Sequence, residues 1–290
     1  MFPAEFEYIR PENLKEAVKL LGVSNGLTVI AGGQSLIPAL KSRKRNPKGL
    51  VDIGGFDELR RIDKVGDKIR IGALATYAIL ERDETIGSQQ PVLREASSQI
   101  ADPLVRNVGT IGGGLVWADP VYDFPALMLV LNSSIIVVGG DGERRIEATS
   151  FFVEPFKSAL KSDEILTGVE VPIKGRREGY AYHKFRKGSG GFSITGAASY
   201  LSLGEDDIIS DCRLAITAPP SKAFRAIEAE RWLIGKGISA PALEHVAKLA
   251  ADEVRSTDPF RASLGYTHSV LLKLIPLALK TAFNKSSEAE

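Results

Sequence analysis

Apolar residues in the first half of the chain recur at helix and strand spacings in turn. Leu14, Ala17, Val18 and Leu21 repeat at the spacing of one helical face. The run Leu27-Thr28-Val29-Ile30 indicates a buried strand. The same patterns predict strands over 68–71, 134–138, 144–147 and 165–171, and helices over 36–40, 76–80 and 92–100. We therefore predict two α/β segments, one over about residues 1–56 and one over about residues 57–175.

The pattern changes after the polar stretch 174–178, which we take as a domain boundary. Three strand-like runs follow near 180–185, 193–203 and 208–217, and no helix separates them. Successive strands without intervening helices predict an antiparallel sheet. Three helical stretches then cover 223–234, 240–254 and 267–283. The sequence thus predicts an α+β protein with one domain over residues 1–175 and a second over residues 176–290.

Composition and charge exclude several classes of protein. The chain is 44% hydrophobic and 25% charged, which is typical of a globular protein. Its 37 basic and 36 acidic residues give a net charge of +1, so no general positive field would hold nucleic acid. The one basic cluster, Lys41 to Arg45, is typical of a solvated loop. No long apolar run predicts a membrane span, and the N-terminus lacks the pattern of a secretory signal.

Cysteine and histidine limit the metal chemistry of the chain. Cys212 is the only cysteine, so no internal disulfide is possible and we expect a reducing, cytoplasmic location. An iron–sulfur cluster needs about four thiolates, so this chain cannot hold one alone. The histidines His183, His245 and His268 show no metal-ligand spacing, and we expect no metal site. We also find no convincing catalytic triad or pair of carboxylates.

Two glycine clusters carry the main chemical signal. The first, Ala31-Gly32-Gly33-Gln34-Ser35-Leu36, directly follows a predicted strand, and the second is Gly109-Thr110-Ile111-Gly112-Gly113-Gly114. Glycine lets a ligand approach the backbone, and consecutive N–H groups in such turns form an anion-binding nest. Two nests that converge from two segments would suit a pyrophosphate. Either cluster alone is better explained as a tight strand-to-helix turn, and neither matches the P-loop or the GxGxxG fingerprint.

Taken together, the two clusters resemble those of the FAD-binding medium subunit of molybdenum hydroxylases, the family of carbon monoxide dehydrogenase, xanthine dehydrogenase and aldehyde oxidoreductases. The resemblance covers essentially the whole chain, including the segments Phe6 to Pro11, Ala118 to Pro120, Asp163 to Leu166 and Tyr182 to Lys187. It implies an FAD-binding domain of the PCMH/vanillyl-alcohol-oxidase type, made of two α/β subdomains. A C-terminal domain like that of the CO dehydrogenase flavoprotein would follow.

The resemblance also implies which residues bind the cofactor. The backbone around the FAD pyrophosphate would be that of Ala31, Gly32, Gly33, Gln34, Ser35, Leu36, Thr110, Ile111, Gly112, Gly113 and Gly114. Asp123 matches an acidic position that hydrogen-bonds the flavin nucleotide, and Ile100 and Leu166 match positions near the cofactor. Lys184 and Phe192 match positions beside the isoalloxazine ring. The alternatives are a helix N-cap for Asp123, an exposed strand lysine for Lys184 and a core phenylalanine for Phe192.

Three positions depart from the family pattern. Gln34 stands where many relatives have His, Gly114 where many have Asn, and Gly191 where an acidic residue is common. Binding through the backbone should survive the changes at Gln34 and Gly114, because it does not depend on side chains. Gly191 would alter the edge of the flavin site.

The resemblance implies an oxidoreductase subunit that relays electrons rather than oxidising the substrate itself. A large partner subunit would carry the molybdenum cofactor, and a small partner would carry [2Fe-2S] clusters, in a dimer of heterotrimers. Electrons would pass from those clusters to FAD and on to an external acceptor. Two alternatives remain open: a free-standing FAD-dependent reductase of the same fold, and a non-catalytic nucleotide-binding module. The choice of substrate, whether aldehyde, carbon monoxide, purine or another heterocycle, belongs to the large subunit.

Overall fold

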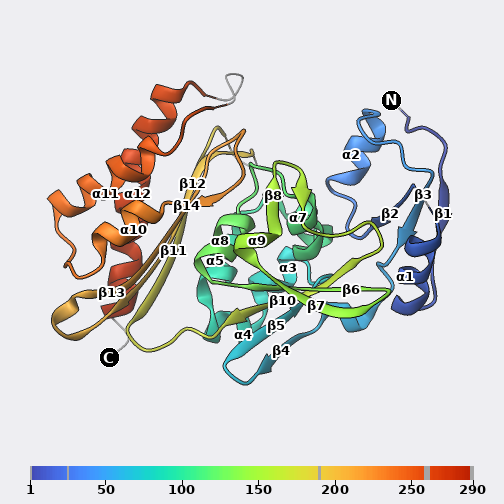
Figure 1. The fold of residues 1–290 in the computed structure, drawn as a ribbon, viewed down its shortest axis with the longest axis horizontal. Coiled ribbons are helices and arrows are strands. Elements are labelled where there is room, and N and C mark those ends of the chain that lie inside the picture. Colours follow the sequence, from blue (N-terminus) through green and yellow to red (C-terminus); the bar gives the residue numbers. More distant parts are fainter. Residues whose placement is uncertain (1, 25, 189–190, 258–261, 288–290) are drawn as a thin grey trace.

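The computed structural model describes residues 2–24, 26–188, 191–257 and 262–287. The chain forms three parts side by side (Figure 1), coloured from blue through green to red along the sequence. The middle part lies between the N-terminal and C-terminal parts.

The N-terminal part is a small parallel α/β unit. Its sheet has the order β1 (Glu7–Ile9), β3 (Gly49–Asp52) and β2 (Leu27–Ile30), with parallel pairing throughout. Helix α1 (Leu14–Val23) buries the predicted apolar face, and helix α2 (Leu36–Lys41) follows β2. The loop between β2 and α2 leaves the sheet at the carboxyl ends of its strands. Ligands of parallel sheets bind at that edge.

The middle part contains a five-stranded antiparallel sheet. The strand order is β4 (Ile62–Val65), β5 (Lys68–Gly72), β10 (Ile165–Pro172), β6 (Ser134–Gly139) and β7 (Gly142–Glu147). All four pairings are antiparallel, and two of them, β4–β5 and β6–β7, are hairpins with short turns. Seven helices belong to the described residues of this part: α3 (Tyr77–Arg82), α4 (Glu84–Gln89), α5 (Pro91–Ser98), α6 (Pro103–Val108), α7 (Ile111–Trp117), α8 (Phe124–Val130) and α9 (Ala148–Phe151). Short segments complete it: η1 (Asp57–Arg60), β8 (Phe152–Glu154) and β9 (Lys157–Ser158).

The second glycine cluster lies in a helix rather than in a turn. Thr110 is the N-cap of α7, and its hydroxyl accepts a hydrogen bond from the N–H of Gly113. Glycine disfavours helices, so the local sequence does not predict one here. The helix forms because its glycines permit tight packing, with Gly112 against Ala73.

The C-terminal part is a four-stranded antiparallel sheet with helices on one face. The strands β11 (Glu178–Arg186), β12 (Ser193–Leu203), β13 (Ile209–Thr217) and β14 (Phe224–Arg225) follow one another in the sheet. The remaining elements are η2 (Glu205–Asp207), α10 (Ile227–Leu233), α11 (Ala240–Asp252) and α12 (Leu264–Ser287). Helix α10 begins later than predicted because residues 224–225 pair with β13 as an edge strand. The predicted α+β fold class is confirmed.

The sheet of the C-terminal part has two differently packed faces. Ala197, Leu201 and Leu214 join the core beneath the helices α10, α11 and α12. Tyr182 and Tyr200 point the other way and join the core of the middle part. Side chains alternate between faces along a strand, so neighbouring residues serve the two cores in turn. Among the described residues, no helix is long and apolar enough to cross a lipid bilayer.

Candidate functional site

A cavity of about 740 Å³ opens where the three parts meet. This volume lies within the range of roughly 300–1,000 Å³ that is typical of cofactor and ligand pockets. Every candidate residue from the sequence except Ile111 lines it. The fold thus brings together residues that lie more than a hundred positions apart, such as Gly33 and Lys184.

The loop from Ala31 to Ser35 forms one wall of the cavity. Gly33 has a φ of 68°, a left-handed conformation that favours glycine. At Gly32 an added Cβ would lie 2.0 Å from the carbonyl oxygen of Val108, so only glycine lets this loop approach the middle part. Within the described part of the chain, no hydrogen bond uses the backbone N–H groups of residues 32–36. These five consecutive donors are therefore available to an anionic ligand.

The backbone of the second glycine cluster is engaged in a different way. The N–H groups of Ile111 and Gly112 donate to the carbonyl oxygens of Ala75 and Ala73, each over 3.0 Å. The N–H of Gly113 donates to Thr110 Oγ1 over 3.1 Å. The anion nest that the sequence suggested at 111–113 is therefore already occupied by bonds within the protein.

Glycine serves close packing at this second cluster. An added Cβ at Gly112 would lie 2.8 Å from the Cβ and the carbonyl oxygen of Ala73, so the residue lets α7 pack against the end of β5. At Gly113 an added Cβ would lie 2.9 Å from Thr110 Oγ1, and outside α7 itself it would meet no other described atom within 4 Å, so the backbone here presents a bare surface to the cavity. The side chain of Ile111 is fully buried in the core and does not line the cavity.

A buried ion pair lies in the cavity wall between the middle and C-terminal parts. Lys184 Nζ is 2.5 Å from Asp123 Oδ2, and the two side chains are only 5% and 4% exposed. Lys184 also donates to the carbonyl oxygen of Gln99 over 2.9 Å. The hydroxyl of Tyr182 donates to the other carboxylate oxygen, Oδ1, over 2.5 Å. Burial raises the pKa of Asp123, while Lys184 and Tyr182 act against that rise.

These contacts decide between the alternatives left open by the sequence. Asp123 stands at the N-cap position of α8, but its side chain makes no capping hydrogen bond and turns to Lys184 and Tyr182 instead. Lys184 is buried and paired, so it is not an ordinary exposed lysine. Phe192 is 62% exposed at the cavity, so it is not a core residue. Ile100 is half-buried and Leu166 is buried, and both contribute apolar surface to the cavity.

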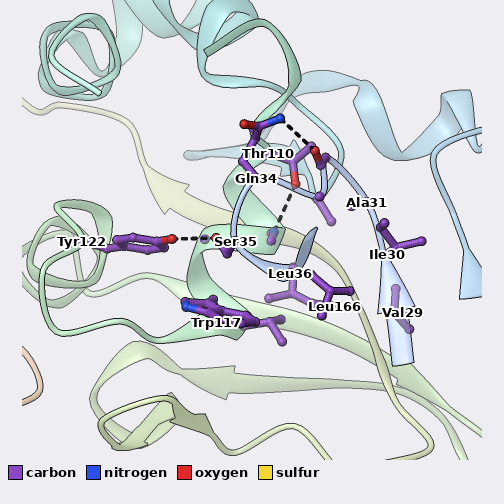
Figure 2. Close-up of a pocket in the computed structure, with 18 of the residues that line it drawn as sticks. Val29, Ile30, Ala31, Gln34, Ser35, Leu36, Thr110, Trp117, Tyr122 and Leu166 are labelled. Atoms are coloured by element: carbon purple, nitrogen blue, oxygen red, sulfur yellow. Dashed lines mark hydrogen bonds between the residues drawn. The ribbon is translucent and has the colours of Figure 1, made fainter. Parts of the chain in front are cut away.

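A hydroxyl pair joins the N-terminal part to the middle part across the cavity. Ser35 Oγ and the hydroxyl of Tyr122 lie 2.6 Å apart and point toward one another (Figure 2). Burial raises the pKa of Tyr122 to about 12, so this side chain keeps its proton at neutral pH. Trp117 lies close to Leu36 in the same view and packs on the small core around α2.

Sequence reasoning missed Trp117, Tyr122 and Tyr182 as parts of the site. Tyr122 and Tyr182 each lie within two residues of a candidate, Asp123 and Lys184 respectively. That proximity was the only signal in the sequence. Aromatic residues beside polar ones are common in cores, so proximity alone does not identify a site.

The residues present fit an FAD molecule. Five unused N–H groups suit the pyrophosphate, and the bare surface of Gly113 permits close approach. The ammonium of Lys184 has three protons, of which Asp123 and Gln99 take two. The hydroxyl of Ser193 is buried, lines the cavity and has no hydrogen-bond partner in the described part of the chain. These unsatisfied polar groups would find partners on a polar dinucleotide.

Two family descriptions match the chain, one for each domain. Residues 4–174 match the FAD binding domain in molybdopterin dehydrogenase. Residues 180–282 match the CO dehydrogenase flavoprotein C-terminal domain. The two matches together cover nearly the whole chain.

Individual relatives agree with these matches. The chain is 34% identical to the glyceraldehyde dehydrogenase medium chain of Sulfolobus acidocaldarius, over 97% of this chain and 99% of that one. It is 33% identical to the nicotine 6-hydroxylase medium subunit of Paenarthrobacter nicotinovorans, over 92% and 94% of the two chains. A solved structure of carbon monoxide dehydrogenase from Hydrogenophaga pseudoflava matches with a TM-score of 0.95 and 32% identity, over 98% of this chain and 99% of that one.

Proposed function

Since the chain belongs to the FAD-binding medium subunits of the molybdenum hydroxylase family, we propose that it relays electrons from iron–sulfur clusters of a partner subunit, through FAD, to an external acceptor. The chain is an oxidoreductase subunit, and its cofactor is FAD. Bound FAD supplies the ability to take up and release electrons singly or in pairs. The protein supplies binding, orientation and electrostatics.

The observation that carries the proposal is the run of five unused N–H groups at residues 32–36 in the wall of the cavity. We assign these groups to the pyrophosphate, together with the bare backbone at Gly113. Thr110 holds the backbone at Gly113 in place, because its hydroxyl caps α7. We further assign Ile100, Asp123, Leu166, Lys184 and Phe192 to the flavin nucleotide, since all of them line the same cavity.

The buried pair of Lys184 and Asp123 has a definite electrostatic role in this proposal. The ammonium places a positive charge in the cavity wall, where burial weakens screening by solvent. A cation at this place favours negative charge on the bound cofactor. The carboxylate of Asp123 partly offsets the positive charge of Lys184. It also fixes the position of the ammonium, because the carboxylate is itself held by a hydrogen bond from Tyr182.

The same proposal extends to partners and location. Cys212 is the only cysteine and is buried, which supports iron–sulfur clusters on a separate small subunit. Relatives named medium chain or medium subunit support a heteromeric complex with a large molybdenum-cofactor subunit. We propose a dimer of heterotrimers in the cytoplasm. We also propose that residues 1–175 bind FAD and that residues 176–290 complete the site and contact partners.

The first test is the absorption spectrum of the full chain, purified in the dark. We expect flavin bands, and chromatography of the released chromophore should identify FAD rather than FMN. A colourless preparation would be reconstituted with FAD first. A chain that still binds no FAD would contradict the cofactor assignment.

A second test addresses the electron relay. In the complex, the substrate of the large subunit should reduce the flavin of this chain. In the isolated chain, NADPH should not reduce the bound flavin. Rapid reduction of the isolated chain by NADPH would instead support a free-standing reductase.

A further inference from the structure

Strand β12 begins with an irregularity beside the cavity. Along most of the β11–β12 pair the register is regular, with Lys184 opposite Gly196 and Phe185 opposite Thr195. The next pair is Arg186 with Ser193, so Ile194 is an extra residue on β12. Such a β-bulge changes which way the following side chain points, and bulges are frequent next to active sites.

The bulge places Ser193 on the cavity face of the sheet. Residues directly opposite each other in an antiparallel pair carry their side chains on the same face. Ser193 therefore shares a face with Arg186, and hence with Lys184 two residues away. Both Lys184 and Arg186 donate to the carbonyl oxygen of Gln99, which confirms that they lie on one side.

Thr195 shows which way the side chain of Ser193 would point if β12 were regular. Two residues along a regular strand point the same way, so Ser193 would share the face of Thr195. The hydroxyl of Thr195 is buried and donates to the carbonyl oxygen of Thr217 within the sheet. Because of the bulge, Ser193 is instead directed to the side on which the cavity lies.

The hydroxyl of Ser193 has no use inside the protein. The residue is only 1% exposed, and its Oγ has no hydrogen-bond partner in the described part of the chain. A buried hydroxyl without a partner is unfavourable, and native proteins seldom keep one without a reason. The oxygen itself is buried, but Ser193 lines the cavity, so rotation about χ1 would bring the hydroxyl to a ligand there, which can supply the missing partner.

We propose that the hydroxyl of Ser193 makes a hydrogen bond to the flavin ring of bound FAD. The inference rests on the proposed function, because it requires FAD in this cavity. The ring, rather than the pyrophosphate, is the partner for two reasons. The unused N–H groups lie on the N-terminal part, whereas Ser193 lies on the C-terminal part beside Lys184 and the exposed ring of Phe192. A cation, a hydroxyl and an exposed aromatic ring suit a flat heterocycle with a polar edge.

The test compares two chemically identical substitutions in the full chain. Ser193→Ala removes the hydroxyl at the cavity. Ser133→Ala removes another buried hydroxyl that has no partner in the described residues and does not line the cavity. Each apoprotein is titrated with FAD, and the dissociation constant and the visible spectrum of the bound flavin are recorded. Thermal unfolding of both variants checks that the fold is kept.

We expect Ser193→Ala to weaken FAD binding roughly three- to tenfold and to shift the flavin absorption bands, as loss of one hydrogen bond would. Ser133→Ala should change neither quantity. Binding of ADP, which lacks the flavin ring, should be equal in both variants and in the wild type. Equal loss of ADP and FAD binding in Ser193→Ala would overturn the assignment to the ring.

The outcomes separate this inference from the proposed function. If the wild-type chain binds no FAD, the cofactor assignment itself fails. If the wild type binds FAD and Ser193→Ala binds it with the same affinity and spectrum, only the role of Ser193 is overturned.

Discussion

The two glycine clusters look alike in sequence but serve different purposes in the structure. The loop at residues 32–36 leaves five consecutive N–H groups unused and includes Gly33 in a left-handed conformation. The cluster at residues 112–114 lies in helix α7, where the amides of Gly112 and Gly113 bond within the protein. One cluster offers hydrogen-bond donors to a ligand, and the other provides close packing and a bare surface.

The comparison shows that glycine content alone does not define an anion site. A nest needs consecutive N–H groups that no other acceptor has taken. At the second cluster the carbonyl oxygens of Ala73 and Ala75 take them. The pyrophosphate assignment therefore depends most on the first loop, and substitutions in the two clusters should have different effects.

The largest expected effect is that of Gly32→Val, which would break the contact between the two clusters. The new Cβ would lie 2.0 Å from the carbonyl oxygen of Val108, and a backbone atom cannot move aside easily. We expect a loss of more than about 3 kcal/mol in the free energy of unfolding. Denaturant unfolding would measure it. Gly22→Val is the control, because an added Cβ there meets nothing within 4 Å, and equal losses in both variants would contradict the packing argument.

A second change alters the charge of the cavity and leaves both glycine clusters intact. Lys184→Met removes the cation that acts against the raised pKa of Asp123, so this pKa should rise further. We expect a loss of about 3 kcal/mol, since breaking a buried ion pair is costly. An acid whose pKa is raised in the folded state contributes stability below its ordinary value of 3.8, and this contribution is lost as the pH rises through the folded-state pKa.

Lys184→Met should therefore be less stable at about pH 8 than at about pH 5, relative to the wild type. Denaturant unfolding at the two pH values provides the measurement. The double variant with Asp123→Asn has no carboxyl to titrate, so this extra pH dependence should disappear. Its persistence in the double variant would show that another group is responsible.

The third prediction separates neighbouring glycines of the second cluster. Gly113→Val adds methyl groups on the cavity surface and should weaken FAD binding about tenfold or more. Its Cβ would lie 2.9 Å from Thr110 Oγ1, so the cap of α7 should weaken and cost about 1 kcal/mol in stability. Gly112→Val should destabilise the fold more, because its Cβ would lie 2.8 Å from the carbonyl oxygen of Ala73, a backbone atom that cannot rotate away. FAD titration and thermal unfolding of both variants test this. Full flavin retention in Gly113→Val would argue against close cofactor approach at this position.

The smallest effect is expected from Tyr122→Phe, which removes the hydroxyl contact with Ser35 in the first loop. We expect a loss of about 1 kcal/mol in stability, as is usual for one hydrogen bond. Ser35→Ala should have a similar effect, and the double variant should lose less than the sum of the two. Strictly additive losses would mean that the two hydroxyls do not depend on each other.

Much of the fold could be predicted from the sequence because its patterns are local. The buried face of α1 and the strand β2 follow from apolar spacing, and the long strands β12 and β13 from continuous apolar runs. Helix α7 could not be predicted, since three of its first four residues are glycines. It exists because Gly112 permits contact with Ala73, a tertiary interaction that no local pattern reveals.

The candidate site also has a part that the sequence predicts and a part that only the structure shows. The residues of the two glycine clusters were found from their spacing and family resemblance, and all but Ile111 line the cavity. The burial of Lys184, its pairing with Asp123 and the contribution of Tyr182 depend on how the C-terminal sheet packs on α8. Contacts between residues so far apart in the chain cannot be read from either segment alone.

The sequence by itself determined the class of this protein: an α+β chain with one cysteine, two glycine clusters and the resemblance to FAD-binding medium subunits. Only the tertiary structure decided which cluster keeps free donors, which charges are buried together and which face Ser193 occupies. Spacing and composition are properties of the chain, and they survive without the fold. Hydrogen-bond satisfaction, burial and strand register are relations between distant segments, and they exist only once those segments are packed.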